Sequence, residues 1–294
     1  MSMQARTGQG NDAAALFRGE GALTLAGLLG FLLAGVCGAW ALAFGGGVAP
    51  DGDVWKAFSF NAALGVFLLS TAAILPLSGL SDRGKRLFRR SYLILAMYSY
   101  FAETAQHFRG VNPRFPEGGA AFDTFLGIGF GIVALLLVLA YAALAAQYFR
   151  KRAAAIRPDM VLAIRYAMAA VMLSFAAGIG IALNGGSAVG ESGSLLWLHG
   201  LGFHALQALP FAAWLAERKA RARERRGLIH FAGASYAAGL AAVGWQTALG
   251  EPVLSWSLPS LLAFACFAAS LAPAARLLWN DARKRSAVRR RRAA

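Results

Sequence analysis

Two apolar stretches of this sequence, residues 91–108 and 195–216, contain polar side chains that could carry out chemistry. Histidine occurs in both stretches beside amides or a carboxylate, and a pair of loop arginines follows the first. These candidate site residues are Glu103, Gln106, His107, Arg109, Arg114, His199, His204 and Gln207. In the first stretch, spacings of three and four residues put the carboxylate, the amide and the imidazole on one face of a helix.

Three chemical interpretations of these residues are open. In the first, His107, His199 and His204 bind a transition metal, or two facing histidines hold one haem, because neutral imidazole is the commonest transition-metal ligand. No H-E-x-x-H, H-x-H or C-x-x-C spacing supports this interpretation. In the second, Glu103 takes up and releases protons in a relay or a proton-coupled transporter. In the third, no cofactor is bound, and the polar groups hold helices together or serve an interaction with another protein.

Arg109 and Arg114 lie in the loop that follows the first stretch. The planar guanidinium group matches the geometry of carboxylates and phosphates. One expectation is that these arginines bind an anionic substrate or a lipid head group. The alternative is that they hold their own loop in place by bonding Glu117, Asp123 or backbone carbonyls.

The elements that position these residues are predicted to be membrane-spanning helices. The chain has 294 residues, of which 58% are hydrophobic and only 15% charged, whereas a soluble globular protein is about 25% charged. Apolar runs of about 20 residues are long enough to cross a bilayer as helices. We therefore expect an all-α polytopic transmembrane bundle of about eight helices, near residues 22–48, 58–80, 91–108, 122–149, 160–183, 195–216, 227–249 and 259–279.

Basic residues predict the orientation of this bundle. Of the 29 Lys and Arg residues, 24 fall in the N-terminal segment, the tail and alternate connectors, namely residues 81–90, 150–157 and 217–226. Because basic residues near the ends of spans stay on the cytoplasmic side, both termini are predicted to be cytoplasmic. The predicted organisation is a cytoplasmic segment 1–21, a single bundle 22–279 and a basic tail 280–294. At membrane-flanking positions, anionic lipid head groups explain the net charge of +15 without nucleic acid as a partner.

This orientation gives each polar residue a depth. His107 and His199 are predicted to lie near the extracytoplasmic surface, and Glu103 and His204 lie about 6–7 Å deeper at about 1.5 Å of rise per residue. The matching depths predict one extracytoplasmic polar site between helices 91–108 and 195–216, which binds a metal, a haem or a small ligand. Five residues of helix separate His199 and His204 by roughly 140°, so only one of them is expected to face Glu103 directly.

Two motifs of this site resemble a known group of sequences. ETAQHFRGVNPRF, residues 103–115, and HGLGFHALQALP, residues 199–210, are similar to uncharacterised bacterial multi-pass membrane proteins. That group has an E-x-x-Q-x-x-R-G loop motif and an H-A-L-Q-x-L-P helix motif. The resemblance implies that these two segments belong together in one family, and it brings no assigned activity. We expect a multi-pass protein of the bacterial plasma membrane.

Signatures of soluble enzymes do not occur in a suitable context in this sequence. There is no P-loop or G-x-G-x-x-G, and no nucleophile suggests a hydrolase. No internal repeat is evident either, so the repeated halves of many transporters are not predicted. Whether the protein is an enzyme is left open.

Overall fold

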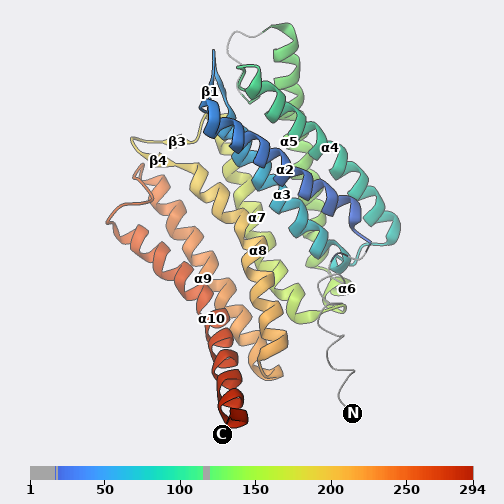
Figure 1. Cartoon of the computed structure of the whole chain (residues 1–294), viewed down its shortest axis with the longest axis vertical. Coiled ribbons are helices and arrows are strands. Elements are labelled where there is room, and N and C mark those ends of the chain that lie inside the picture. The colour runs from blue at the N-terminus through green and yellow to red at the C-terminus, as the bar shows by residue number, and fades with distance from the viewer. Residues whose placement is uncertain (1–16, 18, 115–119, 294) are drawn as a thin grey trace. The chain divides into compact units, whose positions relative to one another are not determined.

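The computed structural model describes residues 17, 19–114 and 120–293, and these residues are almost entirely helical (Figure 1). Eight long helices are present in the described chain, together with the short helix α6, Lys151–Ala154, and the 3-10 turn η1, Leu75–Leu77. The long helices are α2 Gly21–Phe44, α3 Val54–Ile74, α4 Asp82–Phe108, α5 Ala121–Tyr148, α7 Pro158–Leu183, α8 Leu195–Lys219, α9 Ala222–Ala248 and α10 Leu258–Ala293.

Six of these helices are long and apolar enough to cross a membrane: α2, α3 with η1, α5, α7, α9 and α10. The chain is therefore an all-α, multi-pass membrane protein, as the sequence predicted. The remaining two long helices, α4 and α8, have 27 and 25 residues, which is sufficient length to span a bilayer. Their polar side chains lower their hydropathy, and these are the two helices that contain the candidate site residues.

Several helix ends differ from the sequence prediction for identifiable reasons. Helix α2 ends at Phe44 because Gly45 has a φ of +87°, a conformation that favours glycine. Helix α3 begins earlier than expected because the Asp53 side chain accepts a hydrogen bond from the Trp55 amide at 2.9 Å. Helix α4 begins at Asp82 because the Ser81 hydroxyl caps it, so the predicted basic connector is helical.

Two compact units divide the chain, Met1–Gln147 and Tyr148–Ala294. The first contains α2 to α5 and the second contains α6 to α10, within the region expected to form one bundle. Helix α10 continues through residues assigned above to the basic tail. The predicted N-terminal segment lies largely outside the described residues.

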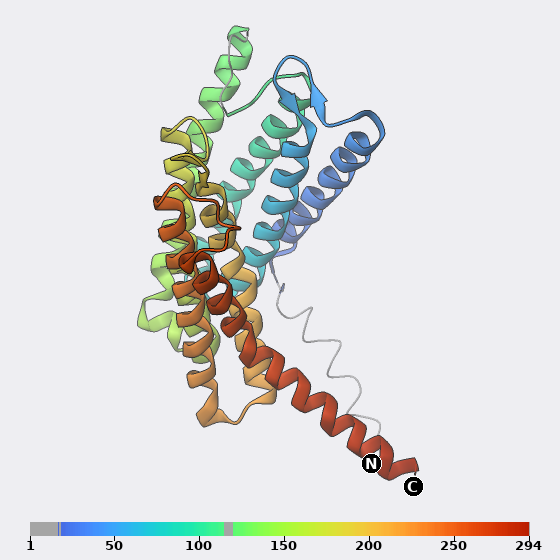
Figure 2. The ribbon, with the colours of Figure 1, turned by 90° about the vertical axis from the view of Figure 1, so that its left-hand side faces the viewer.

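Both units have the same order of elements. In unit 1, α2 leads through the hairpin strands β1, Gly47–Val48, and β2, Gly52–Asp53, into α3. Figure 2 shows the β1–β2 hairpin of the first unit, drawn in blue, at the ends of its helices. In unit 2, α7 leads through β3, Ala188–Val189, and β4, Gly193–Ser194, into α8. Two further helices follow in each unit. The hairpins have the same register, since Val48 pairs with Gly52 and Val189 pairs with Gly193.

The duplication extends to the turn after the third long helix of each unit. Gly110 follows α4 with a φ of +77°, and Gly250 closes the turn after α9 with a φ of +72°. Each glycine carbonyl accepts a hydrogen bond from the hairpin, from the Asp51 amide at 2.8 Å in unit 1 and from the Ser192 amide at 2.9 Å in unit 2. This repeat was not predicted from the sequence, because the identical residues at equivalent positions, such as Gly110 with Gly250 and Gln106 with Gln246, are few and far apart.

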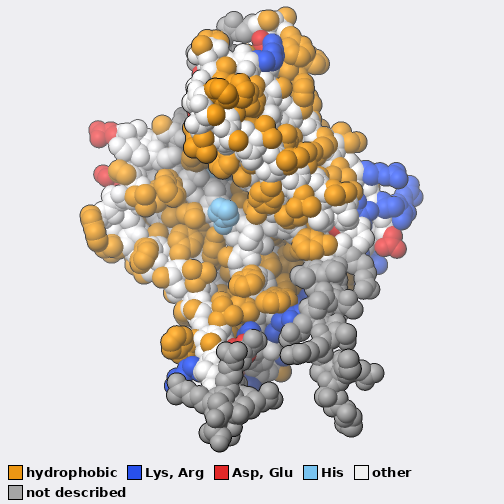
Figure 3. Space-filling view, in the orientation of Figure 1, with side chains coloured by type: hydrophobic (Ala, Val, Ile, Leu, Met, Phe, Trp, Pro, Cys, Tyr) orange, Lys and Arg blue, Asp and Glu red, His pale blue; other side chains and the backbone are white. Residues whose placement is uncertain are grey.

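Ion pairs at the end opposite the hairpins tie helices together within each unit. In unit 1, Glu20 accepts two hydrogen bonds from Arg89, from Nε at 2.7 Å and from Nη2 at 2.6 Å. In unit 2, Arg157 pairs with Glu217, and Lys219 Nζ lies 2.6 Å from Asp281. Hydrophobic side chains cover much of the face shown in Figure 3, and Lys and Arg side chains gather beside the start of α4.

Close helix packing depends on small residues, as expected in lipid. A Cβ atom on Gly30 of α2 would lie 2.8 Å from the Asn61 carbonyl oxygen and from the Gly65 Cα of α3. A Cβ on Gly178 of α7 would lie 2.7 Å from the His199 ring of α8. Glycine at the first position therefore lets two backbones approach closely, and glycine at the second leaves room for the His199 ring.

Candidate functional site

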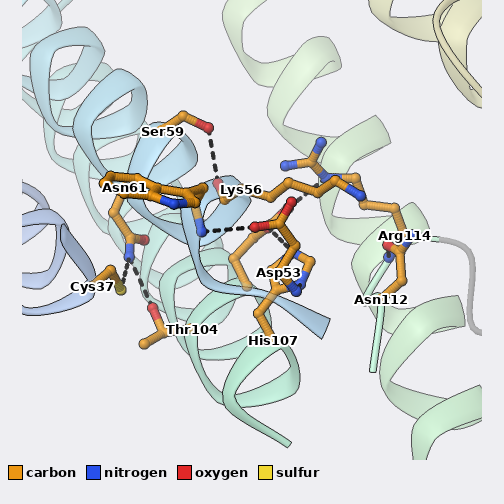
Figure 4. Close-up of polar contacts among 11 residues, drawn as sticks. Cys37, Asp53, Lys56, Ser59, Asn61, Thr104, His107, Asn112 and Arg114 are labelled. Atoms are coloured by element: carbon orange, nitrogen blue, oxygen red, sulfur yellow. Dashed lines mark hydrogen bonds and ion pairs between the residues drawn. The ribbon is translucent and has the colours of Figure 1, made fainter. Parts of the chain in front are cut away.

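A buried carboxylate and a buried imidazole lie together at the end of α4. Glu103 Oε2 and His107 Nε2 are 3.3 Å apart, and their side chains are 0% and 1% exposed. The Asp53 amide donates a hydrogen bond to His107 Nδ1 at 3.1 Å. Since Nδ1 accepts, the proton of the neutral imidazole is on Nε2, the nitrogen that faces Glu103. Figure 4 shows Asp53, which precedes α3, beside His107 of α4.

Arg114 reaches the same carboxylate from the loop after α4. Its Nε lies 2.6 Å from Glu103 Oε1, and its side chain is 38% exposed. The guanidinium carbon is 5.5 Å from the centre of the Phe60 ring of α3, a distance that permits a cation–π interaction. The Asn112 side chain accepts the Arg114 amide hydrogen bond at 3.1 Å and shapes the loop. The site thus combines one acid, one imidazole, one guanidinium and one aromatic ring.

A second polar group joins the end of α4 to the start of α5. Asp123 Oδ1 accepts hydrogen bonds from Gln106 Nε2 at 3.0 Å and from Arg109 Nη1 at 2.7 Å. Arg109 also lies 5.2 Å from the centre of the Phe122 ring. Both loop arginines therefore contact carboxylates of the chain itself, which favours the second expectation for them. Glu117, the other predicted carboxylate partner, lies outside the described residues.

Among the described residues, three buried side-chain atoms have no hydrogen-bond partner: Asn61 Oδ1, Glu103 Oε2 and His107 Nε2. All three belong to unit 1. Glu103 Oε2 and His107 Nε2 lie near each other without the alignment of a hydrogen bond. A buried polar group without a partner costs roughly 1–3 kcal/mol, and more when it is charged. Such atoms therefore indicate a place where a further group can bind.

Unit 2 builds the same turn with neutral side chains. By the backbone hydrogen bonds of the turns, Val243, Gln246 and Thr247 of α9 are equivalent to Glu103, Gln106 and His107 of α4. The Thr247 hydroxyl donates to the Ser194 carbonyl at 3.4 Å. Residues 249–257, which follow the turn, include no Lys or Arg. Acid, imidazole and guanidinium are therefore not needed to fold this motif.

The two equivalent glutamines have a structural role. Both are fully buried, and both bond the segment that follows their helix. Gln106 binds Asp123, whereas Gln246 Nε2 donates to the Pro252 carbonyl and to Ser255 Oγ, each at 2.9 Å. Because this function is common to both units, it does not distinguish a ligand site.

The other predicted site residues, His199, His204 and Gln207, lie on α8 of unit 2. His199 Nδ1 is 2.8 Å from the Ser174 carbonyl oxygen, and its ring packs edge-on against Phe203. His204 is exposed, and its Nδ1 is 3.2 Å from Gln207 Oε1. Both histidines thus have contacts within their own unit. A joint site of α4 and α8 stays a prediction.

The described part of the chain contains no set of side chains suited to coordinate a metal ion. No group of three or more His, Cys, Asp or Glu side chains there is arranged to hold a metal ion. Within unit 1, His107 is the single histidine, and its Nδ1 is already used by the Asp53 amide. The metal and haem interpretation of His107, His199 and His204 therefore gains no support.

Two groups of the site, the Asp53 amide and the Phe60 ring, were not predicted from the sequence. The Asp53 amide was not foreseen because a backbone group at the end of a hairpin has no sequence signal of its own. Phe60 was not foreseen because one phenylalanine in an apolar helix is ordinary. Its position one residue before Asn61, itself a polar residue within an apolar stretch, was the available signal.

Comparisons with known proteins found no match for this chain. No family model, no curated protein and no solved structure matches it. The resemblance to uncharacterised bacterial membrane proteins therefore stays a prediction, and the function must be argued from the site.

Proposed function

We propose that this membrane protein binds a small polar ligand from the extracytoplasmic side, at the buried pair of Glu103 and His107. One observation carries the proposal: unit 2 forms the same hairpin and turn with Val243 and Thr247 at the equivalent positions. A hairpin and turn of this kind therefore form without an acid and an imidazole at these positions. Ligand binding is the function that accounts for their burial.

The arrangement of donor and acceptor suits a small polar molecule. Glu103 Oε2 has acceptor capacity that no hydrogen bond uses, and His107 Nε2 presents a proton beside it. A ligand hydroxyl group can donate to the first atom and accept from the second, whereas a group that only donates pairs with Glu103 alone. Two convergent polar atoms in an otherwise apolar helix packing are typical of small-molecule sites.

An eight-span topology belongs to this proposal. With α4 and α8 counted as spans, both termini and the basic connectors are cytoplasmic, and both hairpins lie on the extracytoplasmic side. Exposed tryptophans near the hairpin ends, Trp55, Trp197 and Trp245, suit the membrane interface. The site then opens to the outside of the plasma membrane of a bacterium.

Native mass spectrometry of the detergent-purified protein tests ligand binding. We expect the wild type to carry a small molecule, either after purification or after incubation with a metabolite mixture, and we expect Glu103→Gln to lose it. Glu217→Gln is the matched control, because Glu217 also pairs with an arginine but belongs to the end opposite the hairpins. If Glu103→Gln and Glu217→Gln retain the same molecules, or if none binds, the proposal is wrong.

A visible spectrum and a metal analysis of the same sample separate the remaining interpretations. A Soret band, or stoichiometric copper, zinc or iron that depends on His107, would replace the small-ligand proposal by a cofactor site. Proton uptake into vesicles that requires Glu103 without any bound molecule would favour the proton relay instead.

A further inference from the structure

The ion pair of Arg114 and Glu103 uses one guanidinium nitrogen, as the pair of Arg109 and Asp123 does, whereas two other arginine pairs of this chain use two. Arg89 donates from two nitrogens to the two oxygens of Glu20, and Arg157 also uses two nitrogens on Glu217. Arg114 contributes one hydrogen bond, from Nε to Oε1, and leaves Oε2 without a hydrogen-bond partner, although His107 Nε2 lies 3.3 Å from it. A carboxylate often accepts from two nitrogens of the guanidinium fork. Glu103 therefore retains capacity for a cationic donor.

The guanidinium of Arg114 approaches Glu103 from the accessible side of the site. The Glu103 side chain is 0% exposed, whereas the Arg114 side chain is 38% exposed. The space between solvent and the buried carboxylate is therefore occupied in part by Arg114 itself. A molecule that reaches Glu103 by this route has to take the place of the arginine side chain.

Phe60 adds an aromatic surface to the same position. Arg114 lies over its ring at 5.5 Å from the centre, and the ring is supported by Phe130 of α5 at 6.0 Å. A carboxylate beside an aromatic face binds organic cations through ionic and cation–π attraction. The groups that surround Arg114 would hold another ammonium or guanidinium group equally well.

An anionic ligand fits these contacts poorly. An anion bound by the remaining nitrogens of Arg114 would lie close to the buried Glu103 carboxylate, and the two like charges would repel each other. Arg109 is already engaged by Asp123 at 2.7 Å. A cation, in contrast, replaces one positive charge by another and preserves the balance of charge.

We infer that the ligand is an organic cation, a primary ammonium or guanidinium group on a short carbon chain, which binds Glu103 in place of Arg114. This inference rests on the proposed ligand site at Glu103 and His107. In the resting protein Arg114 occupies the position of the ligand. Removing its side chain should therefore strengthen binding of an external cation.

Calorimetric titration of the full-length protein in detergent with n-butylammonium and n-butylguanidinium tests the inference. We expect one saturable site in the wild type and roughly tenfold tighter binding in Arg114→Ala, because the wild type must first displace its own side chain. Phe60→Leu should weaken binding roughly two- to fivefold through the lost cation–π contact. Glu103→Gln should abolish cation binding, both alone and combined with Arg114→Ala. Glu217→Gln should leave cation binding unchanged.

Neutral and anionic probes of the same size, butanol and butyrate, are the chemical controls. Saturable binding of butyrate, or cation binding that survives Glu103→Gln, would overturn the inference. Arg114→Gln is titrated in parallel, so that a folded variant without the guanidinium is tested if Arg114→Ala aggregates. Failure of both cations to bind folded Arg114→Gln or Arg114→Ala overturns the inference as well.

The mass-spectrometric experiment distinguishes this failure from failure of the proposed function. If a non-cationic molecule copurifies and is lost in Glu103→Gln, the ligand site stands and only its cationic class is wrong. If Glu103→Gln loses neither a copurified molecule nor cation binding, both proposals are wrong.

Discussion

Arg114 Nε lies 2.6 Å from Glu103 Oε1, and this contact joins a partly exposed loop side chain to a completely buried carboxylate. The two partners are thus unequal in their access to water. When the carboxylate is removed, Arg114 can return to solvent. When the arginine is removed, the carboxylate stays buried without its cation. This asymmetry makes the pair a sensitive test of the site.

Arg114→Ala is expected to destabilise the protein by roughly 1–3 kcal/mol, the usual effect of losing a hydrogen bond to a charged group. Glu103→Gln should cost less, because the remaining arginine is hydrated. The double variant should have the same free energy of unfolding as Glu103→Gln alone. Its buried carboxylate is absent, so losing the arginine leaves no buried charge without a partner. Thermal unfolding in detergent, followed by tryptophan fluorescence, measures all three. Equal destabilisation by both single variants would contradict the expected asymmetry.

His107→Asn and His107→Ala should differ in their effect on the β1–β2 hairpin. An Asn side chain can present an acceptor near the position of Nδ1 and preserve the bond from the Asp53 amide, whereas Ala loses it. We expect faster hydrogen exchange in residues 47–53 in His107→Ala than in His107→Asn, measured by mass spectrometry. The hairpin of unit 2, residues 188–194, is the internal control and should not respond. Equal exchange in the two variants would show that the Asp53 to His107 bond does not hold the hairpin.

Gly110→Ala and Gly250→Ala should both destabilise the protein, because these glycines perform the same function in the two units. Each has a positive φ, which costs a residue with a Cβ roughly 1–2 kcal/mol. In addition, a Cβ on Gly110 would overlap the Ala49 carbonyl, and one on Gly250 would lie 3.1 Å from the Gly190 Cα. Gly110→Ala should therefore have the larger effect on the unfolding temperature.

Gly35→Ala is the control for this pair of glycine variants. Gly35 lies within α2 and is exposed, and a Cβ atom at this position would meet no neighbouring side chain within 4 Å. Ala there should be neutral or stabilising by up to about 1 kcal/mol, since it favours helix. If Gly250→Ala behaves like Gly35→Ala, the two turns are not equivalent.

Cysteine labelling in intact cells tests the eight-span topology. Asp51→Cys and Glu191→Cys, both in exposed hairpin positions, are expected to react with a membrane-impermeant maleimide. Arg83→Cys and Arg221→Cys, at the basic ends of α4 and α9, should react only after the cells are permeabilised. The native Cys37 and Cys266 are replaced by Ala in this background. Labelling of Asp51→Cys and Glu191→Cys from opposite sides would mean that α4 does not span the membrane. Labelling of Glu191→Cys and Arg221→Cys from the same side would mean that α8 does not.

Local features of the sequence were sufficient to predict part of the site. The spacing of four residues between Glu103 and His107 predicted a shared helical face, because helical periodicity is a local property. Hydropathy predicted the six most apolar helices for the same reason. The partners of Arg109 and Arg114 stayed open, since a loop can place an arginine on any of several carboxylates. Only the tertiary contacts assign Asp123 to the first and Glu103 to the second.

The sequence by itself determined a multi-pass helical membrane protein, because the length and hydropathy of its segments decide which helices enter lipid. It also determined which helix faces are polar. Only the tertiary structure decided that the chain consists of two units with the same order of elements. That similarity depends on left-handed glycines and on backbone hydrogen bonds between a hairpin and a distant turn, and such contacts leave no pattern in neighbouring residues. The comparison of the two units is what separates the buried Glu103 and His107 from the groups that merely build the turn.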